Sequence, residues 1–175
     1  YGDELTAIPY AVTSANGLAD GDEALLGSLA PSGKDVNLEG YTIEMGTLQE
    51  LNPNYLITLE TADHKYIITP RPISVTVEPK TIVYGDEPIA LEYKAEGLIG
   101  EDTLNGELYC DLGTDAKSYP ITQGTLNHPN YEITTFNGAD YTITPRAIVV
   151  TIKDAESDFG QEIAELEWYI SKGRL

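Results

Sequence analysis

Several residue types and features are scarce in this chain of 175 residues, and each scarcity removes a class of structure or function. The single cysteine, Cys110, excludes a disulfide within one chain. No apolar run is long enough to cross a membrane as a helix. Only 10 basic residues accompany 29 acidic ones, and the net charge of −19 repels nucleic acids and anionic membranes. We therefore expect no nucleic-acid partner and no membrane insertion.

The aromatic residues are almost all tyrosine, with 12 Tyr against 2 Phe and 1 Trp. Tyrosine suits thin β layers because its ring can be buried while its hydroxyl reaches water. Hydrophobic residues make up 41% of the chain, which indicates a globular rather than a disordered protein.

The sequence repeats itself. A unit that returns at a spacing of 75 to 83 residues is a module in an array. Arrays of this kind usually perform mechanical or binding work. The matched segments are residues 1–4 with 84–87, 40–48 with 118–126, 52–55 with 128–131, 66–72 with 141–147, and 71–93 with 146–168.

We predict three parts, separated at the recurring Thr-Pro-Arg sequence. Residues 1–72 form repeat 1 without its first strand, residues 73–147 form repeat 2, and residues 148–175 are the incomplete start of repeat 3. Proline fixes φ and keeps its neighbour extended, so the joint should be short and stiff. An alternative frame places the break at the Tyr-Gly-Asp turn. Because the chain begins and ends inside repeats, we expect it to be a piece of a longer protein.

Apolar and polar residues alternate in residues 73–77, 89–93, 108–112 and 166–170. This period of two predicts strands with one buried and one exposed face. The fold class is therefore all-β, as tandem small β modules, with an Ig-like sandwich favoured. A β-grasp-like fold is the alternative. It would use one short helical turn, for which the candidate segments are residues 17–27 and 97–106.

The predicted core consists of apolar and aromatic residues that recur on inward faces. Recurrent tyrosines could also serve as stacking platforms for carbohydrate, but strict recurrence on alternating strands favours the core. Cys110 should pack inward, whereas Tyr109 and Tyr169 lie on outward faces and are candidates for exposed contacts. The predicted core residues are Tyr10, Tyr41, Ile43, Tyr55, Ile57 and Ile68 in repeat 1, and Leu91, Tyr93, Ile121, Tyr131, Ile133 and Ile143 in repeat 2.

Recurrence also tests for catalysis, because residues that serve a repeated activity should return in each repeat. His64 and His128 do not recur, and Cys110 has no basic helper near it in sequence. A Ser-His-Asp or Cys-His site is therefore not expected. We predict that the protein is not an enzyme and has no catalytic residues.

Acidic loops are the candidates for binding calcium. Residues 20–23 and 101–102 are acidic, and Asp3 and Asp86 recur. However, the closing Glu of an EF-hand loop is missing, and the third copy has Gln161 in place of the Asp. We interpret these acids as solvated turn residues. The sequence predicts no metal site and no cofactor.

Repeat 2 carries its motifs in a fixed order. They are Tyr84-Gly-Asp, Gly97-Leu98, Gly100, Asp102, Leu104, Gly106, Tyr119-Pro-Ile, Gly124-Thr-Leu, Asn130-Tyr131 and Tyr141-Thr-Ile-Thr-Pro. This ordered set resembles the MBG domain of the YGX type. The resemblance covers nearly all of residues 1–147 and the opening of repeat 3. It implies an extracellular, non-enzymatic module that occurs in tandem in bacterial surface proteins, and it supplies no catalytic residues.

Two functions follow as hypotheses. The first is a stalk or spacer of a bacterial cell-surface protein. The second is an adhesin module that binds a glycan or a host protein through its variable loops, residues 17–27 and 28–38. Both place the protein outside the cell, on the bacterial surface or secreted.

The ends of the chain suggest a further partner, a second copy of the chain itself. Repeat 1 has no counterpart of residues 73–77, and residues 148–152 and 164–170 supply apolar strands from an unfinished repeat. Exposed strand edges recruit other strands. The tail of one chain could thus complete repeat 1 of another in a strand-exchange homo-oligomer. Alternatively, the tail folds onto repeat 2, or a different module frame leaves no open position.

Overall fold

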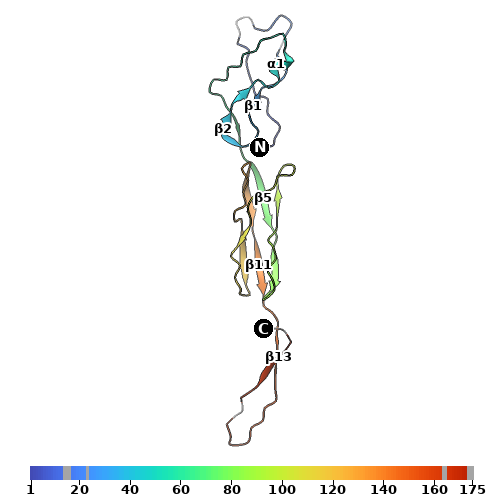
Figure 1. Ribbon diagram of the computed structural model, residues 1–175, viewed down its shortest axis with the longest axis vertical. Coiled ribbons are helices and arrows are strands. Elements are labelled where there is room, and N and C mark those ends of the chain that lie inside the picture. The colour runs from blue at the N-terminus through green and yellow to red at the C-terminus, as the bar shows by residue number, and fades with distance from the viewer. Residues whose placement is uncertain (14–16, 23, 163–164, 173–175) are drawn as a thin grey trace. The chain divides into compact units, whose positions relative to one another are not determined.

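The computed structural model describes residues 1–13, 17–22, 24–162 and 165–172 (Figure 1). Its regular secondary structure is almost entirely β-strand, arranged in several small sheets, which confirms the predicted all-β class. The chain divides into two compact units. The first contains residues 1–75, 95–106 and 126–135, and the second contains residues 76–94, 107–125 and 136–175.

Residues 71–144 form two sheets with different numbers of strands (Figure 1). A three-stranded sheet has the order β10-β5-β7, and a four-stranded sheet has the order β6-β11-β9-β8. Strand β11 pairs in parallel with β6 and antiparallel with β9. The strand bounds are β5 (Arg71–Val77), β6 (Lys80–Val83), β7 (Tyr93–Glu96), β8 (Tyr109–Cys110), β9 (Ser118–Thr122), β10 (Tyr131–Asn137) and β11 (Ala139–Thr144).

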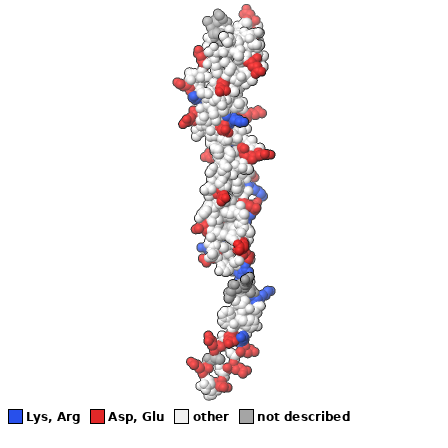
Figure 2. Space-filling model, in the orientation of Figure 1, with Lys and Arg blue, Asp and Glu red and all other residues white. Residues whose placement is uncertain are grey.

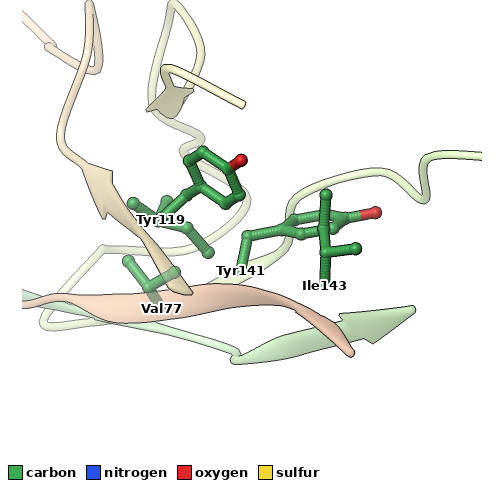
Figure 3. Packing of buried hydrophobic residues seen from close by; sticks show 5 residues of the cluster. Val77, Tyr119, Tyr141 and Ile143 are labelled. Atoms are coloured by element: carbon green, nitrogen blue, oxygen red, sulfur yellow. The ribbon is translucent and has the colours of Figure 1, made fainter. Parts of the chain in front are cut away.

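The core of the second unit draws residues from both sheets. Val77 of β5 packs with Tyr119 and Ile121 of β9 and with Tyr141 and Ile143 of β11 (Figure 3). Two sheets that share one core make a small sandwich. Residues 73–147, all of which the structure describes, contain no helix.

Repeat 1 contains shorter elements: β1 (Ala30–Pro31), β2 (Asn37–Tyr41), β3 (Ile43–Glu44), α1 (Leu48–Leu51) and β4 (Tyr66–Ile68). Several of its pairings match those of repeat 2, although the β2–β4 register shifts between Asn37 and Tyr41, where β9–β11 runs without a shift. Ala30 opposite Glu44 corresponds to Tyr109 opposite Thr122. Likewise, the pairing of Tyr41 with Tyr66 reproduces that of Tyr119 with Tyr141. The internal sequence repeat is therefore accompanied by a partial repeat of strand pairing.

The predicted helical turn was placed wrongly. Among the described residues, 17–27 and 97–106 contain turns but no helix. The one-turn helix α1 lies instead at residues 48–51. In repeat 1 three residues separate Leu48 from Asn52, whereas in repeat 2 one residue separates Leu126 from His128. The two extra residues extend the chain enough to close one turn.

The predicted core is only partly correct. Ile68, Ile121, Tyr131 and Ile143 are buried, which confirms four positions. Tyr10 was predicted to be buried, but 41% of its surface is exposed. The remaining members are half-buried, namely Tyr41, Ile43, Tyr55, Ile57, Leu91, Tyr93 and Ile133.

The alternation of residues 73–77 is confirmed, since Ile73, Val75 and Val77 are all buried. It fails at Ile89, which was predicted to face inward but is exposed because residues 87–92 precede β7 and form no strand.

Strands β12 (Val149–Ile152) and β13 (Trp168–Lys172) pair as a two-stranded antiparallel ribbon. The second strand starts later than predicted, and Ala164 lies outside the described residues. Leu166 and Trp168 were predicted to face inward but are exposed, because a two-stranded ribbon has no second layer to cover one face. Within the described part of the chain, no helix is long and apolar enough to cross a membrane.

Candidate functional site

The recurring Tyr-Gly-Asp and Thr-Pro-Arg motifs meet in space. In repeat 2, Arg146 Nε donates a hydrogen bond to the Tyr84 carbonyl at 2.6 Å, and its Nη2 pairs with the Asp86 carboxylate. The Tyr84 N–H donates to the Thr144 carbonyl at 2.8 Å. We call this group the Arg clamp. It fastens the end of β11 to the turn that follows β6.

Repeat 1 contains the same clamp. Arg71 Nη1 donates to Asp3 Oδ1 at 2.6 Å and to the Tyr1 carbonyl at 3.3 Å. The amino group of Tyr1 donates to the Thr69 carbonyl at 2.9 Å. The recurring Asp is thus the ion-pair partner of the recurring Arg.

Repeat 3 keeps the turn but changes the acid. The Gln161 N–H donates to the Asp158 carbonyl at 3.1 Å, as the Asp86 N–H does to the Val83 carbonyl at 2.9 Å. Gly160 has a φ of 84°, a left-handed conformation that favours glycine. The backbone turn therefore does not depend on the Asp side chain.

The Gly-Thr-Leu motif forms a second recurring fastener. In repeat 2, Thr125 Oγ1 accepts the Glu107 N–H at 3.0 Å, and the Thr125 N–H donates to the Glu107 carbonyl at 2.9 Å. In repeat 1, Thr47 makes the same pair of bonds with Ser28 at 3.1 and 3.0 Å. The leucines that follow, Leu48 and Leu126, are each only 2% exposed.

A tyrosine and an aspartate organise the acidic loop of each repeat. Tyr131 donates its hydroxyl to Asp102 Oδ2 at 2.6 Å and accepts the Ile99 N–H at 3.0 Å. In repeat 1, Tyr55 donates to Asp22 at 2.6 Å and accepts the Ala19 N–H at 2.9 Å. These two aspartates, which were candidates for calcium binding, serve as acceptors for tyrosine.

Both tyrosine hydroxyls are shifted towards the neutral form. Burial, followed by the hydrogen bond to Asp102, raises the pKa of Tyr131 above its ordinary value of 10.0. For Tyr55 the hydrogen bond to Asp22 is the main cause of the raised pKa. A carboxylate acceptor favours the neutral phenol because ionisation would place two negative charges side by side.

Two buried asparagines satisfy backbone groups of neighbouring loops. Asn52 accepts the Leu26 N–H at 2.9 Å and donates to the Leu26 carbonyl at 2.7 Å. Asn130 accepts the Val36 N–H at 2.9 Å and donates to Asp35 Oδ1 at 2.9 Å. Buried polar side chains with such partners stabilise loop conformation without requiring a ligand.

The residues considered for catalysis do not come together as a reactive group. Cys110 is half-buried against the core and donates weakly to the Tyr119 carbonyl, with an S···O distance of 3.8 Å. Burial raises the pKa of its thiol, which disfavours the nucleophilic thiolate. His128 packs edge-on against Tyr131 and accepts the Asn130 N–H at 3.1 Å. His64 is exposed.

The described residues contain no group of three or more His, Cys, Asp or Glu side chains arranged to hold a metal ion. Glu23, one member of the acidic loop, lies outside the described residues. On the face shown in Figure 2, acidic side chains are spread over the surface rather than gathered in one patch.

Two hollows of about 340 and 440 Å³ adjoin the Arg71 clamp in the first unit. Tyr1, Asp3, Arg71 and Gly97 line the first. Arg71 already donates to the Tyr1, Asp3 and Gly97 oxygens, which occupies most of the polar lining. Neither hollow shows the convergent polar groups in an apolar pocket that are typical of ligand sites.

Sequence reasoning missed the arginines. It treated Asp3 and Asp86 as turn acids and assigned no role to Arg71 or Arg146. The signal was present, because Arg recurs directly after the Thr-Pro of each joint and Asp recurs in each complete Tyr-Gly-Asp turn. Pairing two recurring opposite charges would have predicted the clamp. Tyr109 and Tyr169 are exposed as predicted.

Residues 73–144 match the family model of the MBG domain (YGX type). This match confirms the resemblance predicted from the ordered motifs, and residues 73–144 are therefore an MBG domain. No curated protein matches the chain. No solved structure matches it either.

Proposed function

We propose that this protein is a non-enzymatic, extracellular repeat module of a bacterial cell-surface protein and that it acts as a stalk or spacer. The observation that carries the proposal is the Arg clamp, which joins the Tyr-Gly-Asp turn to the Thr-Pro-Arg joint in both repeats. Residues that recur in both repeats form fasteners: Arg with Asp, Thr with the backbone of a residue just before a strand, and Tyr with Asp.

The position of the clamp suits a segment that transmits tension. Strand β11 leads directly to the Thr-Pro-Arg joint, and β6 runs parallel to it from Tyr141 opposite Lys80 to Thr144 opposite Val83. A pull along β11 loads the bonds of this ladder together rather than one after another. Thr144 Oγ1 adds a bond to the Ile82 carbonyl at 3.1 Å. The Arg clamp secures the point where the chain leaves the ladder.

Single-molecule force spectroscopy on the whole chain tests this role. Arg146→Ala should lower the unfolding force of repeat 2, because forced unfolding follows the unfolding rate and the clamp holds the first bonds to be loaded. The equilibrium stability should change by only about 0.2–1 kcal/mol, as for other exposed ion pairs. A large equilibrium loss with no change in force would contradict the mechanical role.

Lys94→Ala provides a matched control. Lys94 Nζ pairs with Glu78 Oε1 at 3.4 Å, and Lys94 is exposed. This change also removes one cation from an ion pair of the same repeat, but away from the end of β11. The unfolding force should equal that of the unmodified chain.

The alternative function is an adhesin module that binds a glycan or host protein through residues 17–27 and 28–38. It is supported by the difference in length of these loops between repeats. Part of the second loop is engaged internally, since Asp35 and Val36 contact Asn130. A glycan array and a pull-down from host extracts decide between the two. Reproducible binding that disappears when residues 17–27 are replaced by residues 97–106 would favour the adhesin.

A further inference from the structure

Inside the first unit, the Tyr-Gly-Asp turn of repeat 1 covers one face of the MBG domain. The Tyr1 ring meets the Tyr131 ring edge-on, with centroids 5.4 Å apart and an interplanar angle of 79°. The Tyr1 hydroxyl donates to Asp102 Oδ2 at 3.3 Å. The turn contacts Ile99, Asp102 and Tyr131, and we call these residues together with the adjoining Asn130 the docking face.

The turn packs closely against the docking face. A Cβ added to Gly2 would lie 1.7 Å from Ile99 Cδ1, so a larger residue requires the end of the Ile99 side chain to shift. Gly2 also has a φ of 74°, a conformation that favours glycine. Asn130 is buried and bonded to Asp35 and Val36. The docking face therefore fits a turn that presents an aromatic ring followed by glycine.

Repeat 1 carries a second copy of this face. The corresponding residues are Ala19, Asp22, Asn54 and Tyr55, held by the same Tyr–Asp and Tyr–backbone hydrogen bonds. Here Ala19, Asp22 and Asn54 are exposed and Tyr55 is half-buried.

The complementary element is also present twice. Tyr1 is half-buried against Tyr131, whereas its counterpart Tyr84 is 51% exposed. Gly85 follows it with a φ of 86°, and Gly2 has a φ of 74°. The chain thus presents an exposed docking face on repeat 1 and an exposed Tyr-Gly-Asp turn on repeat 2.

We propose that the face formed by Ala19, Asp22, Asn54 and Tyr55 binds the Tyr84-Gly85-Asp86 turn of a second copy of this chain. The Tyr84 ring packs against Tyr55, and its hydroxyl donates to Asp22. Such a contact joins unlike surfaces, so it produces head-to-tail association. This self-association is independent of the stalk function, since it requires no tension.

Two features make the association weak. Ala19 replaces Ile99, so the glycine of the incoming turn meets less apolar surface. Each chain also carries a net charge of −19, and like charges repel across the interface. Salt screens this repulsion, so association should strengthen as the ionic strength rises.

Sedimentation equilibrium of the whole chain, at low and high salt, provides the test. The average mass should rise with concentration, more steeply at high salt. Tyr84→Ser and Asn54→Glu should each weaken association by about tenfold or more. Tyr109→Ser and Thr58→Glu are matched controls, because each changes an exposed residue that belongs neither to the Tyr84-Gly85-Asp86 turn nor to the face around Tyr55. Both variants should associate like the unmodified chain.

Mixing the two defective variants gives the sharpest result. The Tyr84→Ser chain keeps its docking face, and the Asn54→Glu chain keeps its turn, so an equal mixture should form a 1:1 dimer that grows no further. A chain that stays monomeric at its highest soluble concentration would overturn the proposal. So would association that both variants leave intact, which would instead indicate the β12–β13 ribbon or strand exchange.

Discussion

Repeats 1 and 2 share their motifs and several strand pairings but differ in how well they bury the same residues. Tyr141 is 1% exposed, whereas its counterpart Tyr66 is only half-buried. The difference follows from β5 and β6, which have no counterpart within residues 1–72. β5 is the central strand of β10-β5-β7, and it contributes Val77 to the core around Tyr141.

The segments of residues 1–72 that correspond to the neighbours of β5 are also irregular. Residues 10–13 and 55–61 of repeat 1 correspond to β7 and β10, yet they form no strands. Both β7 and β10 are hydrogen-bonded to β5, so without it their backbone groups have no ladder to join. The clamp, the Gly-Thr-Leu fastener and the Tyr–Asp loop persist in both repeats. The motif contacts therefore form whether or not a counterpart of β5 is present, whereas the three-stranded sheet needs β5 as its central strand.

The largest expected effect comes from the buried tyrosine. Tyr141→Ala should destabilise repeat 2 by about 3–5 kcal/mol, because it removes a buried ring from the core. It also removes the acceptor of the Ile89 N–H, now 2.8 Å away. Tyr66→Ala should cost much less in repeat 1. Chemical denaturation monitored by hydrogen exchange, read separately for the amides of each repeat, measures the two destabilisations. Equal losses of stability from the two variants would contradict the comparison.

The buried asparagine of repeat 1 should have the next largest effect. Asn52→Ala should cost about 1–3 kcal/mol, because the Leu26 N–H and carbonyl lose their partners. Asn54→Ala, two residues away and exposed, is the matched control and should be nearly neutral. Thermal melting of the two variants makes the measurement. Equal melting temperatures would show that Asn52 does not hold the loop.

Comparing alanine substitutions at Gly124 and Gly100 separates the cost of backbone strain from the cost of a steric clash. Gly124 and Gly100 share a φ of 59°, but a Cβ on Gly124 would lie 2.3 Å from the Glu107 carbonyl oxygen, while Gly100 has no atom within 4 Å. Gly100→Ala should show only the cost of the left-handed backbone, roughly 1 kcal/mol. Gly124→Ala should cost at least about 1 kcal/mol more. Denaturation midpoints that agree for both variants would exclude the contact as the cause.

The sequence predicted the elements that depend on local pattern. The buried alternation of residues 73–77 and the MBG domain itself follow from spacing and motif order. It did not predict the Arg146–Asp86 pair, whose partners are 60 residues apart. Nor did it predict that Tyr10 is exposed, because the burial of a strand residue depends on neighbours that repeat 1 does not contain. The exposure of Trp168 was missed for the same reason. The alternation of polar and apolar residues shows which face of a strand is apolar, but it does not show whether a second layer covers that face.

The smallest expected effect concerns alkaline pH. The pKa of Tyr131 is raised in the folded state, first by burial and then by the hydrogen bond to Asp102. Its contribution to stability is therefore fully present below a pH of about 10, where the unfolded phenol is neutral, and is lost as the pH rises through the folded pKa. Tyr131→Phe should flatten this part of the stability profile. Denaturation between pH 8 and 12 measures it, and an unchanged slope would contradict the assignment.

Hydrogen exchange on the unmodified chain tests the central comparison most directly. If β5 is what distinguishes the repeats, amides of β9 and β11 should exchange far more slowly than those of their counterparts β2 and β4, even though Tyr41 pairs with Tyr66 as Tyr119 pairs with Tyr141. The amides of Thr47 and Thr125, which belong to the fastener common to both repeats, should differ less. Equal protection of the two pairs of strands would contradict the account, because repeat 1 would then be as stable without a central strand as repeat 2 is with one.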